Sequence, residues 1–545
     1  MPNSVPTLAV FRNRTFRMLW IATLASNFGG LVQSVGAAWM MTTLTSSQAM
    51  VALVQSSVTL PIMIFSLTAG VFADNYDRRK IMLWAQSFMC LVSIVLAFLA
   101  FEGLLSPWLL LSFTFMIGCG TALHTPSWQA SVGDIVSREE LPAAVSVNSM
   151  GFNMMRSVGP AAGGAIVALA GAAAAFAVNA FSYIAIIAAL FGWRPQRPPR
   201  TLPREPFGSA FAAGLRYVAL SPNLIRIILR GCIFGVSAVA VLALLPLVVR
   251  DHLDGGALTY GVLLGCFGFG AVGGALANGR LRDRFRNEII TRMGFAGFIV
   301  TFTVLALSPF AVLSGASLLL AGFCWVISLS LFNVTMQLST PRWVVGRVLA
   351  LYQTGTFGGM AAGSWIWGAI SEQAGLQVAL FVACGALLFG ALVGMVAPLP
   401  DSQDLNLDPA NRFTEPPLQL DITPRSGPIM IMVDYEIDQT DVPRFLELMS
   451  QRRRVRVRDG AQQWSLLRDL ENPDLWTESY HVPTWVEYIR HNERRTHVDA
   501  GVFDQLKALH KGSAPLRVHR MIERQTVSPR DNIPRRVHPD PAEQV

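Results

Sequence analysis

Long apolar runs occupy most of the chain up to about residue 398, and polar residues dominate from there on. A run of about 20 apolar residues is long enough to cross a bilayer as a helix. We identify about twelve such runs, several of which contain Gly or Pro. They lie at residues 17–43, 50–73, 80–101, 104–126, 142–170, 172–193, 225–249, 258–279, 288–308, 311–338, 346–371 and 376–397. The pattern predicts an all-α, multi-pass membrane region followed by a soluble part.

Basic residues gather in every second loop between these runs. The basic segments include Arg12, Arg14, Arg17, Arg78, Arg79, Lys80, Arg194, Arg197, Arg200, Arg280, Arg282, Arg284, Arg286, Arg342 and Arg347. The alternate loops have almost none, apart from Arg250. Cytoplasmic loops carry an excess of Lys and Arg. We therefore expect a cell (inner) membrane protein with both termini in the cytoplasm and an even number of spans.

Composition supports this reading and limits the partners. Only 14% of the 545 residues are charged and the mean hydropathy is +0.43, whereas soluble proteins carry about 25% charge. Basic loops account for the net charge of +8, so we expect membrane lipid as a partner and no nucleic acid. The six cysteines all fall in apolar runs without CxxC spacing, where single cysteines are usually apolar fillers. No metal and no cofactor are expected.

The polar part contains alternating and helical patterns in the order β-α-β-β-α-β. Strands are predicted at 429–437, 462–470, 475–482 and 515–523, and a helix begins near Thr440. This order is typical of a small α+β ferredoxin-like domain, which we place at 428–525, between a linker at 399–427 and a flexible tail at 526–545. One face of such a sheet needs covering, so a homodimer through this domain is plausible.

Catalysis in the soluble domain is the weaker interpretation. His481, His491, His497 and Trp485 invite it. They show no metal-ligand spacing and no nucleophile constellation. We therefore expect no enzyme, and favour a regulatory or dimerising module.

The stretch GVFADNYDRRK at 70–80 joins two apolar runs by a short basic turn. Gly70 and Asp74 share a helix face, so a neighbouring helix can approach at the glycine while Asp74 accepts hydrogen bonds or pairs with an arginine. Such a latch can form in one conformation and break in another. The alternative is a purely topological signal. The stretch resembles motif A of the major facilitator superfamily: Gly70, Asp74, Arg78 and Arg79 match, whereas Asn75 and Asp77 depart.

This resemblance implies a 12-helix fold of two six-helix halves that alternate around a central site. An internal sequence repeat agrees with two halves, since SVGPAAGG at 157–164 matches FGGMAAGS at 357–364. We place the halves at 1–193 and 225–398, joined by a cytoplasmic Pro/Arg-rich linker at 194–224.

A second motif lies in the fifth predicted span. Gly159, Pro160, Gly163 and Gly164 resemble motif C, which is associated with the exporter and antiporter branches of the superfamily. Pro160 removes a backbone hydrogen bond and kinks the helix, and the glycines permit close packing. Close packing alone is the simpler explanation of the small residues.

Arg156 precedes this motif, and an arginine at membrane depth is costly and points to function. It could bind an anionic group of a substrate, pair with a carboxylate, or extend to an interface. A central cavity is predicted from the intramembrane polar and aromatic residues Asn27, Gln33, Trp39, Arg156, Asn179, Asn333 and Gln337. Proton or other ion coupling has no evident carrier, because Thr114 stands where an arginine is usual and no acid lies well inside a span.

The soluble domain, through RRRVRVRDGAQQWSL and SYHVPTWVEYIRHNERRT, resembles the domain appended to the transmembrane secretion effector branch, whose wider relatives include enterobactin-type exporters. The resemblance implies a secondary transporter that exports a small amphipathic molecule, siderophore-like or drug-like. The alternatives are an importer of the same fold, or a membrane-tethered enzyme or sensor that acts through the C-terminal domain.

Overall fold

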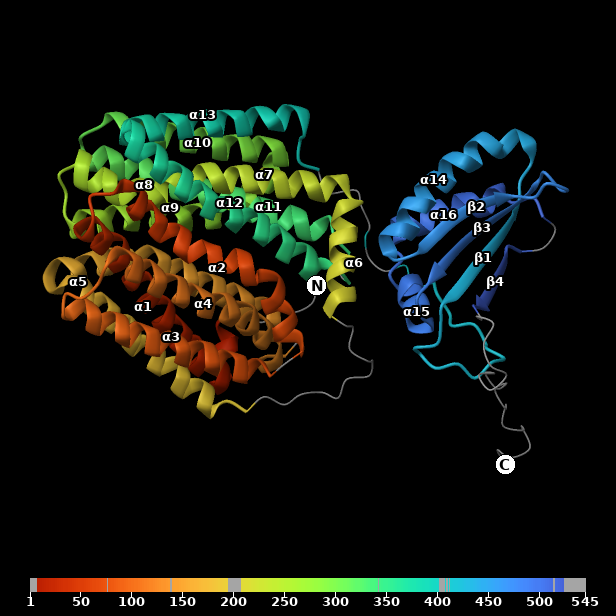
Figure 1. Cartoon of the computed structure of the whole chain (residues 1–545), viewed down its shortest axis with the longest axis horizontal. Coiled ribbons are helices and arrows are strands. Elements are labelled where there is room, and N and C mark those ends of the chain that lie inside the picture. The colour runs from red at the N-terminus through yellow and green to blue at the C-terminus, as the bar shows by residue number, and fades with distance from the viewer. Residues whose placement is uncertain are drawn as a thin grey trace. The chain divides into compact units, whose positions relative to one another are not determined.

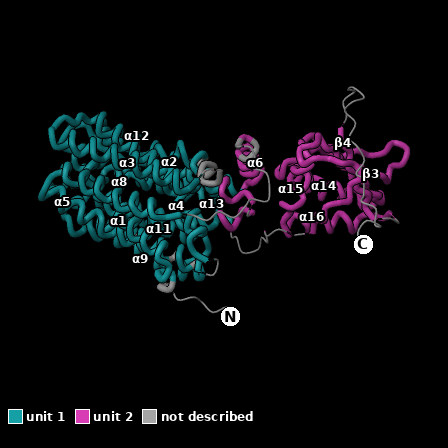
Figure 2. Tube along the Cα trace, turned by 90° about the horizontal axis from the view of Figure 1, so that it is seen from below, with its two compact units in different colours: residues 1–207, 223–336, 349–401 teal, residues 208–222, 337–348, 402–545 magenta. Residues whose placement is uncertain are grey.

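The structure is a computed structural model of the chain, and its elements divide into two compact units (Figures 1 and 2). It describes residues 7–75, 77–137, 140–194, 207–341, 343–400, 407, 410, 412–512 and 515–523. The side chains of Gly70 and Asp74 lie outside this description. The first unit comprises residues 1–207, 223–336 and 349–401, and the second comprises residues 208–222, 337–348 and 402–545.

The first unit is a helical bundle in which the red to orange helices lie beside the yellow to green ones (Figure 1). Its helices are α1 (Arg14–Leu44), α2 (Gln48–Asn75), α3 (Arg78–Phe101), α4 (Pro107–Ile135), α5 (Leu141–Gly192), α7 (Pro222–Ala238), α8 (Ala240–Leu247), α9 (Ala257–Arg284), α10 (Asn287–Leu307), α11 (Ala311–Leu338), α12 (Val345–Ala374) and α13 (Leu376–Val396). A 3-10 turn, Thr7–Arg12, precedes α1, and a π-helical turn, Val248–His252, follows α8.

Ten helices of the described part are long and apolar enough to cross a membrane. Two features separate this number from the predicted twelve. Element α5 consists of two helical segments, 52 residues in all, which meet at a kink at Gly171, where φ is 79° and the backbone is not helical. Glycine adopts such a positive φ without a steric penalty. Helix α12 is not among the ten, and glycine, serine and threonine make much of its sequence weakly apolar.

The second unit is built on a four-stranded antiparallel sheet with the order β2-β3-β1-β4. The strands are β1 (Ile429–Glu436), β2 (Gln462–Arg468), β3 (Leu475–Val482) and β4 (Arg517–Ile522). Helices α14 (Val442–Asp459), α15 (Trp485–Glu493) and α16 (His497–Leu509) accompany it. The predicted order of elements is confirmed, and the strand boundaries agree within two residues.

Alternation along the strands builds the core of this unit. Ile431, Val433 and Tyr435 of β1 are buried, as are Phe445 and Met449 of α14. Side chains two apart in a strand point to the same face, so one face of the sheet packs against the helices.

Two segments that connect membrane helices belong to this unit as well: α6 (Phe207–Ala219) and residues 337–348 (Figure 2). The Arg458 guanidinium lies 4.9 Å from the ring centroid of Tyr217 in α6. The Arg494 guanidinium lies 4.2 Å from the ring centroid of Trp343. Tyr217 and Trp343 meet edge to face with their centroids 5.7 Å apart.

Candidate functional site

Helices α5 and α9 approach so closely that their backbones touch. A Cβ atom on Gly164 would lie 2.7 Å from both the Ala257 carbonyl oxygen and the Gly261 Cα. On Gly268 it would lie 2.4 Å from the Arg156 carbonyl oxygen. Only glycine permits this approach, as in other membrane helix pairs. The α5–α9 seam joins residues from the two predicted halves.

The other glycines of the predicted export motif contact α1. A Cβ on Gly159 would meet Leu31 at 2.9 Å, and one on Gly163 would meet the Val32 Cα at 3.0 Å. Pro160 is buried inside α5. The motif thus lies between α1 on one side and α9 on the other, and its small residues set both distances.

Helices α2 and α12 form a second seam, which is held by hydrogen bonds. The Ser66 and Thr354 hydroxyls are 2.7 Å apart, and the Ser56 hydroxyl donates to the Ala361 carbonyl at 2.8 Å. A Cβ on Gly358 would lie 2.8 Å from the Met63 sulfur. The α2–α12 seam is therefore more polar than the α5–α9 seam.

Polar contacts concentrate at the end of the bundle that holds the α1–α2 connection. The Glu372 carboxylate accepts from the Ser47 hydroxyl at 2.7 Å and from the Ala49 backbone N–H at 2.9 Å. Arg250 donates to the Thr42 carbonyl at 3.1 Å. A carboxylate on the first turn of α2 also complements the helix dipole. These contacts tie α12 and the end of α8 to the α1–α2 connection.

Arg156 lies in the α5–α9 seam, midway along α5 between Leu141 and Gly171. Its guanidinium carbon is 5.6 Å from the ring centroid of Phe267 in α9 and 5.8 Å from that of Trp325 in α11. No carboxylate of the described residues forms a salt bridge with it. Contact with two aromatic faces offsets part of the cost of burying the charge, by about 2 kcal/mol or more for a desolvated pair.

Gln33 and Asn179 are buried in a hydrogen-bonded cluster inside the first group of helices. The Asn179 amide donates to the Gln33 side-chain oxygen and, at 3.1 Å, to the Tyr183 hydroxyl. The Ser93 hydroxyl donates to the same Gln33 oxygen at 3.0 Å. Satisfied polar groups of this kind join membrane helices, so the cluster links α1, α3 and α5. Their predicted place in a cavity stays a prediction.

The remaining predicted cavity residues are spread over three environments. Trp39 stacks on Tyr260 of α9 with ring centroids 6.2 Å apart. Asn27 is half-buried in α1 and Asn333 half-buried in α11, whereas Gln337 is exposed near the end of α11. The structure thus brings Trp39 and Arg156 to the seam with α9 and places Gln337 elsewhere.

The arginines of the predicted switch motif bind helix ends. Arg78 donates to the Asp134 carboxylate at 2.7 Å and to the Ala130 carbonyl at 3.0 Å. Arg79 donates to the Leu190 carbonyl at 2.8 Å. Cations near helix C-termini are stabilising. Asp77, one of the two departures from the motif, caps α3 by accepting from the Lys80 N–H at 3.3 Å. The predicted latch at Gly70 and Asp74 falls outside the described side chains.

Sequence reasoning missed the aromatic partners of Arg156 and the Ser66–Thr354 pair. Phe267 and Trp325 extend a group of buried rings around Phe234 and Phe298. Aromatic residues are common in apolar spans, so nothing local separated these from the others. Within the described residues, no cluster of three His, Cys, Asp or Glu side chains could hold a metal ion.

Comparison with known proteins assigns the chain to a family. The transmembrane secretion effector family of the major facilitator superfamily matches residues 5–527. The enterobactin exporter EntS of Escherichia coli O1:K1 is 26% identical over 330 residues, which are 60% of this chain and 77% of that protein. An inward-facing bacterial homologue of the lysosomal transporter Spinster has a TM-score of 0.57 at 14% identity, over 71% of this chain and 97% of that one. The nucleoside transporter NupG has a TM-score of 0.54 at 14% identity, over 70% and 98%. The chain is a multi-pass membrane transporter and belongs to the transmembrane secretion effector family of the major facilitator superfamily.

Proposed function

We propose that this transporter exports a small amphipathic molecule with an anionic group, siderophore-like or drug-like, by alternating access. The observation that carries the proposal is Arg156, a cation midway along a membrane helix, at a seam and against aromatic rings. Among the described residues it has no carboxylate partner. An anionic substrate would neutralise this charge, and its apolar part would suit the neighbouring rings. The distant relationship to enterobactin exporters supports the direction of transport.

The proposal includes the topology. If α5 crosses the membrane once on each side of Gly171 and α12 crosses once, the ten candidate helices become twelve spans. With that topology, the excess of basic residues in alternate loops favours both termini and the C-terminal domain on the cytoplasmic side. The polar contacts around Glu372 and Arg250 would lie at the outer face, where they would close the pathway in an inward-open state.

Alternation needs contacts that can part and re-form. The α5–α9 seam is glycine-rich and in backbone contact, and the α2–α12 seam is hydrogen-bonded. We propose that the halves rock about these two seams, and that Gly70, Asp74, Arg78 and Arg79 contribute a state-dependent latch at the cytoplasmic side.

Identifying the cargo comes first. Small molecules inside and outside cells would be compared with and without the gene, under iron-replete and iron-starved conditions. A compound that accumulates inside the deletion strain and disappears from the medium identifies the cargo and confirms export. A compound that instead accumulates in the medium of the deletion strain would overturn export in favour of import.

The role of Arg156 is then tested on that compound. Arg156→Ala should reduce efflux at least tenfold, because one charge-assisted interaction with a buried anion is worth about 1.5–3 kcal/mol. Arg156→Lys keeps the charge but not the planar stacking group, so we expect intermediate efflux. Arg226→Ala, at an exposed arginine of α7, is the matched control. Normal efflux by Arg156→Ala at equal membrane expression would refute the assignment.

A further inference from the structure

The C-terminal domain contains a cavity of about 490 Å³ between the sheet and its helices. Its walls come from β1, β3, β4, α14, α15, α16 and the segment before β1. The volume falls within the usual range for small-molecule sites, about 300–1,000 Å³. All these elements belong to the second unit, so the cavity is a feature of that unit alone.

Basic side chains outnumber acidic ones in the lining. Six of them face the cavity: Arg412, Arg452, Arg456, Arg495, Lys507 and Arg520. Among the described residues of the lining, Asp504 is the only acidic one, and it already accepts from Arg412 at 2.8 Å. Buried Glu478, behind the lining, is shared by Arg452 at 2.7 Å and Arg456 at 3.1 Å. Positive charge therefore remains in excess.

Arg495 is one of the basic residues that line the cavity. Its side chain bonds the Asn492 side-chain oxygen and stacks 5.8 Å from the Phe503 ring centroid, and none of the described carboxylates pairs with it. Burial, and then the charge of Arg456, lowers the pKa of Arg495 to about 10. Burial, Arg456 and Arg495 together hold the pKa of His491 well below its usual 6.5. Burial is the larger cause of both shifts, and the charges of neighbouring arginines add to it.

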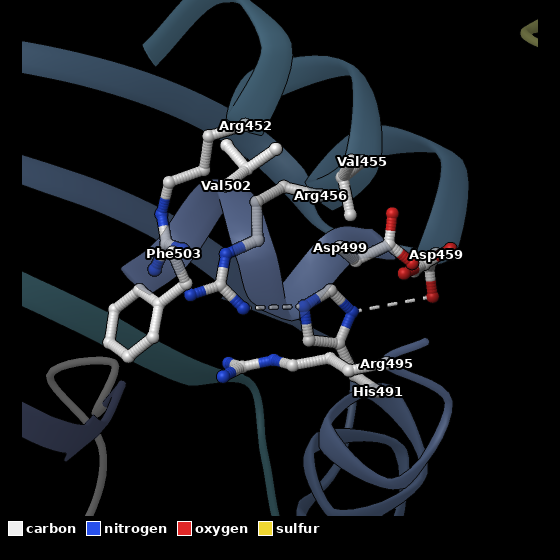
Figure 3. Close-up of a pocket in the computed structure, with 9 residues that line it drawn as sticks. All are labelled: Arg452, Val455, Arg456, Asp459, His491, Arg495, Asp499, Val502 and Phe503. Carbon is white, nitrogen blue, oxygen red and sulfur yellow. Dashed lines mark hydrogen bonds between the residues drawn. The ribbon is translucent and has the colours of Figure 1, made fainter. Parts of the chain in front are cut away.

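Figure 3 shows a second, smaller space of about 20 Å³, lined by residues of α14, α15, α16 and the α15–α16 connection. His491 lies between Arg456, 2.8 Å from its Nε2, and the Asp459 carbonyl, so the imidazole is committed to these bonds. Arg495 and Phe503 line both the small space and the large cavity. The small space suits a water molecule at most, and the large cavity is the one with room for a ligand.

Aromatic and apolar groups complete the large cavity and restrict the ligand. Four aromatic rings line the cavity: Phe413, Tyr480, Tyr488 and Phe503. Ile431 and Val433 of β1 add apolar surface. A bare inorganic anion would leave these surfaces unfilled, whereas an aromatic ring can stack on them and on guanidinium planes. Arginine also binds carboxylate groups in a bidentate manner.

We propose that this cavity binds a small molecule that combines an aromatic ring with two or more anionic groups. This proposal is independent of the cargo and of the direction of transport, because the cavity and Arg156 lie in different units. A transporter with such a domain can sense an aromatic anion in the compartment that the domain faces.

Titration calorimetry of the purified full-length protein tests the proposal with benzene-1,3,5-tricarboxylate as the probe. Propane-1,2,3-tricarboxylate has the same charges without the ring, benzene-1,3,5-tricarboxamide has the ring without the charges, and inorganic phosphate is a bare anion. We expect saturable binding of the aromatic trianion and at least tenfold weaker binding of the other three. Equal affinity for phosphate or for the aliphatic trianion would overturn the aromatic assignment.

Variants locate the site. Arg495→Gln should weaken binding of the aromatic trianion at least tenfold, and so should Lys507→Gln at the exposed rim, which does not threaten folding. Arg454→Gln, on the exposed side of α14, is the matched control and should change the affinity less than twofold. No saturable binding by the wild-type protein, or equal losses in Arg454→Gln and Lys507→Gln, would overturn the proposal.

Discussion

Replacing Gly261 by alanine tests how the α5–α9 seam holds the two groups of helices together. A Cβ atom at this position would lie 2.6 Å from the Gly164 Cα, 2.7 Å from the Pro160 carbonyl oxygen and 2.9 Å from the Gly164 nitrogen. Ordinary contacts of a Cβ begin near 3.4 Å. All three atoms belong to the backbone, so no side-chain rotation can relieve the clash. The two helices must therefore separate by roughly 1 Å at this point.

The magnitude follows from two opposing effects. Overpacking of a tight interface costs about 1–3 kcal/mol, whereas alanine in a helix gains about 0.4–1 kcal/mol over glycine through the unfolded chain. Gly279 lies on the same helix and a Cβ there would meet nothing within 4 Å, so Gly279→Ala shows the gain alone. The difference between the two variants isolates the seam, at about 1–3 kcal/mol, or roughly 5- to 150-fold in its opening equilibrium.

Hydrogen exchange of the full-length protein in detergent measures this equilibrium without a substrate. Peptides over residues 156–166 and 257–268 should exchange faster in Gly261→Ala than in Gly279→Ala, while peptides from β1 and β3 report an unaffected unit. Equal exchange of the seam peptides in the two variants would show that backbone contact does not hold the seam, and would refute the reasoning.

Two further predictions follow from side-chain contacts. The Ser66 and Thr354 hydroxyls are 2.7 Å apart, so cysteines at these two positions would bring their sulfurs within reach of each other. The double variant Ser66→Cys and Thr354→Cys should cross-link on oxidation and lose transport, and a reductant should restore transport. Transport that persists in fully cross-linked protein would exclude movement at the α2–α12 seam. Burial alone would raise the pKa of Glu478, but Arg452 and Arg456 lower it from 4.5 to about 2. Because one pKa unit corresponds to about 1.4 kcal/mol, Glu478→Gln should destabilise the C-terminal domain by about 3 kcal/mol at pH 7. Faster hydrogen exchange in β3 would measure this loss. A carboxyl with a depressed pKa stabilises the fold above its unfolded value, so this contribution is present above pH 4.5 and is lost as pH falls toward 2. Unchanged exchange in the variant, or an acid response equal to that of the wild type, would contradict this account.

Local pattern predicted most of the secondary structure, but it missed helix α6 (Phe207–Ala219), which lies inside the predicted linker at 194–224. Helix and strand periods are properties of neighbouring residues, so apolar runs located the membrane helices and alternation located β1 and β3. The predicted boundary between the spans 142–170 and 172–193 coincides with the kink at Gly171, where the backbone leaves the helical conformation. The sequence did not predict that α6 and residues 337–348 belong to the same unit as the C-terminal domain, because this depends on contacts between segments far apart in sequence.

The sequence by itself determined that Arg156 is an unusual residue and that the glycines around Pro160 permit close packing, because both conclusions need only the membrane setting of one helix. The tertiary structure decided what they contact: Phe267 and Trp325 for the arginine, Gly261 for Gly164. It also decided that Gln33 and Asn179 bind each other, and that basic residues scattered between Arg412 and Arg520 converge on one cavity. Periodicity gives the face of an element on which a side chain lies. Its neighbours across the fold depend on helix crossings and strand register, which are set by packing over the whole unit.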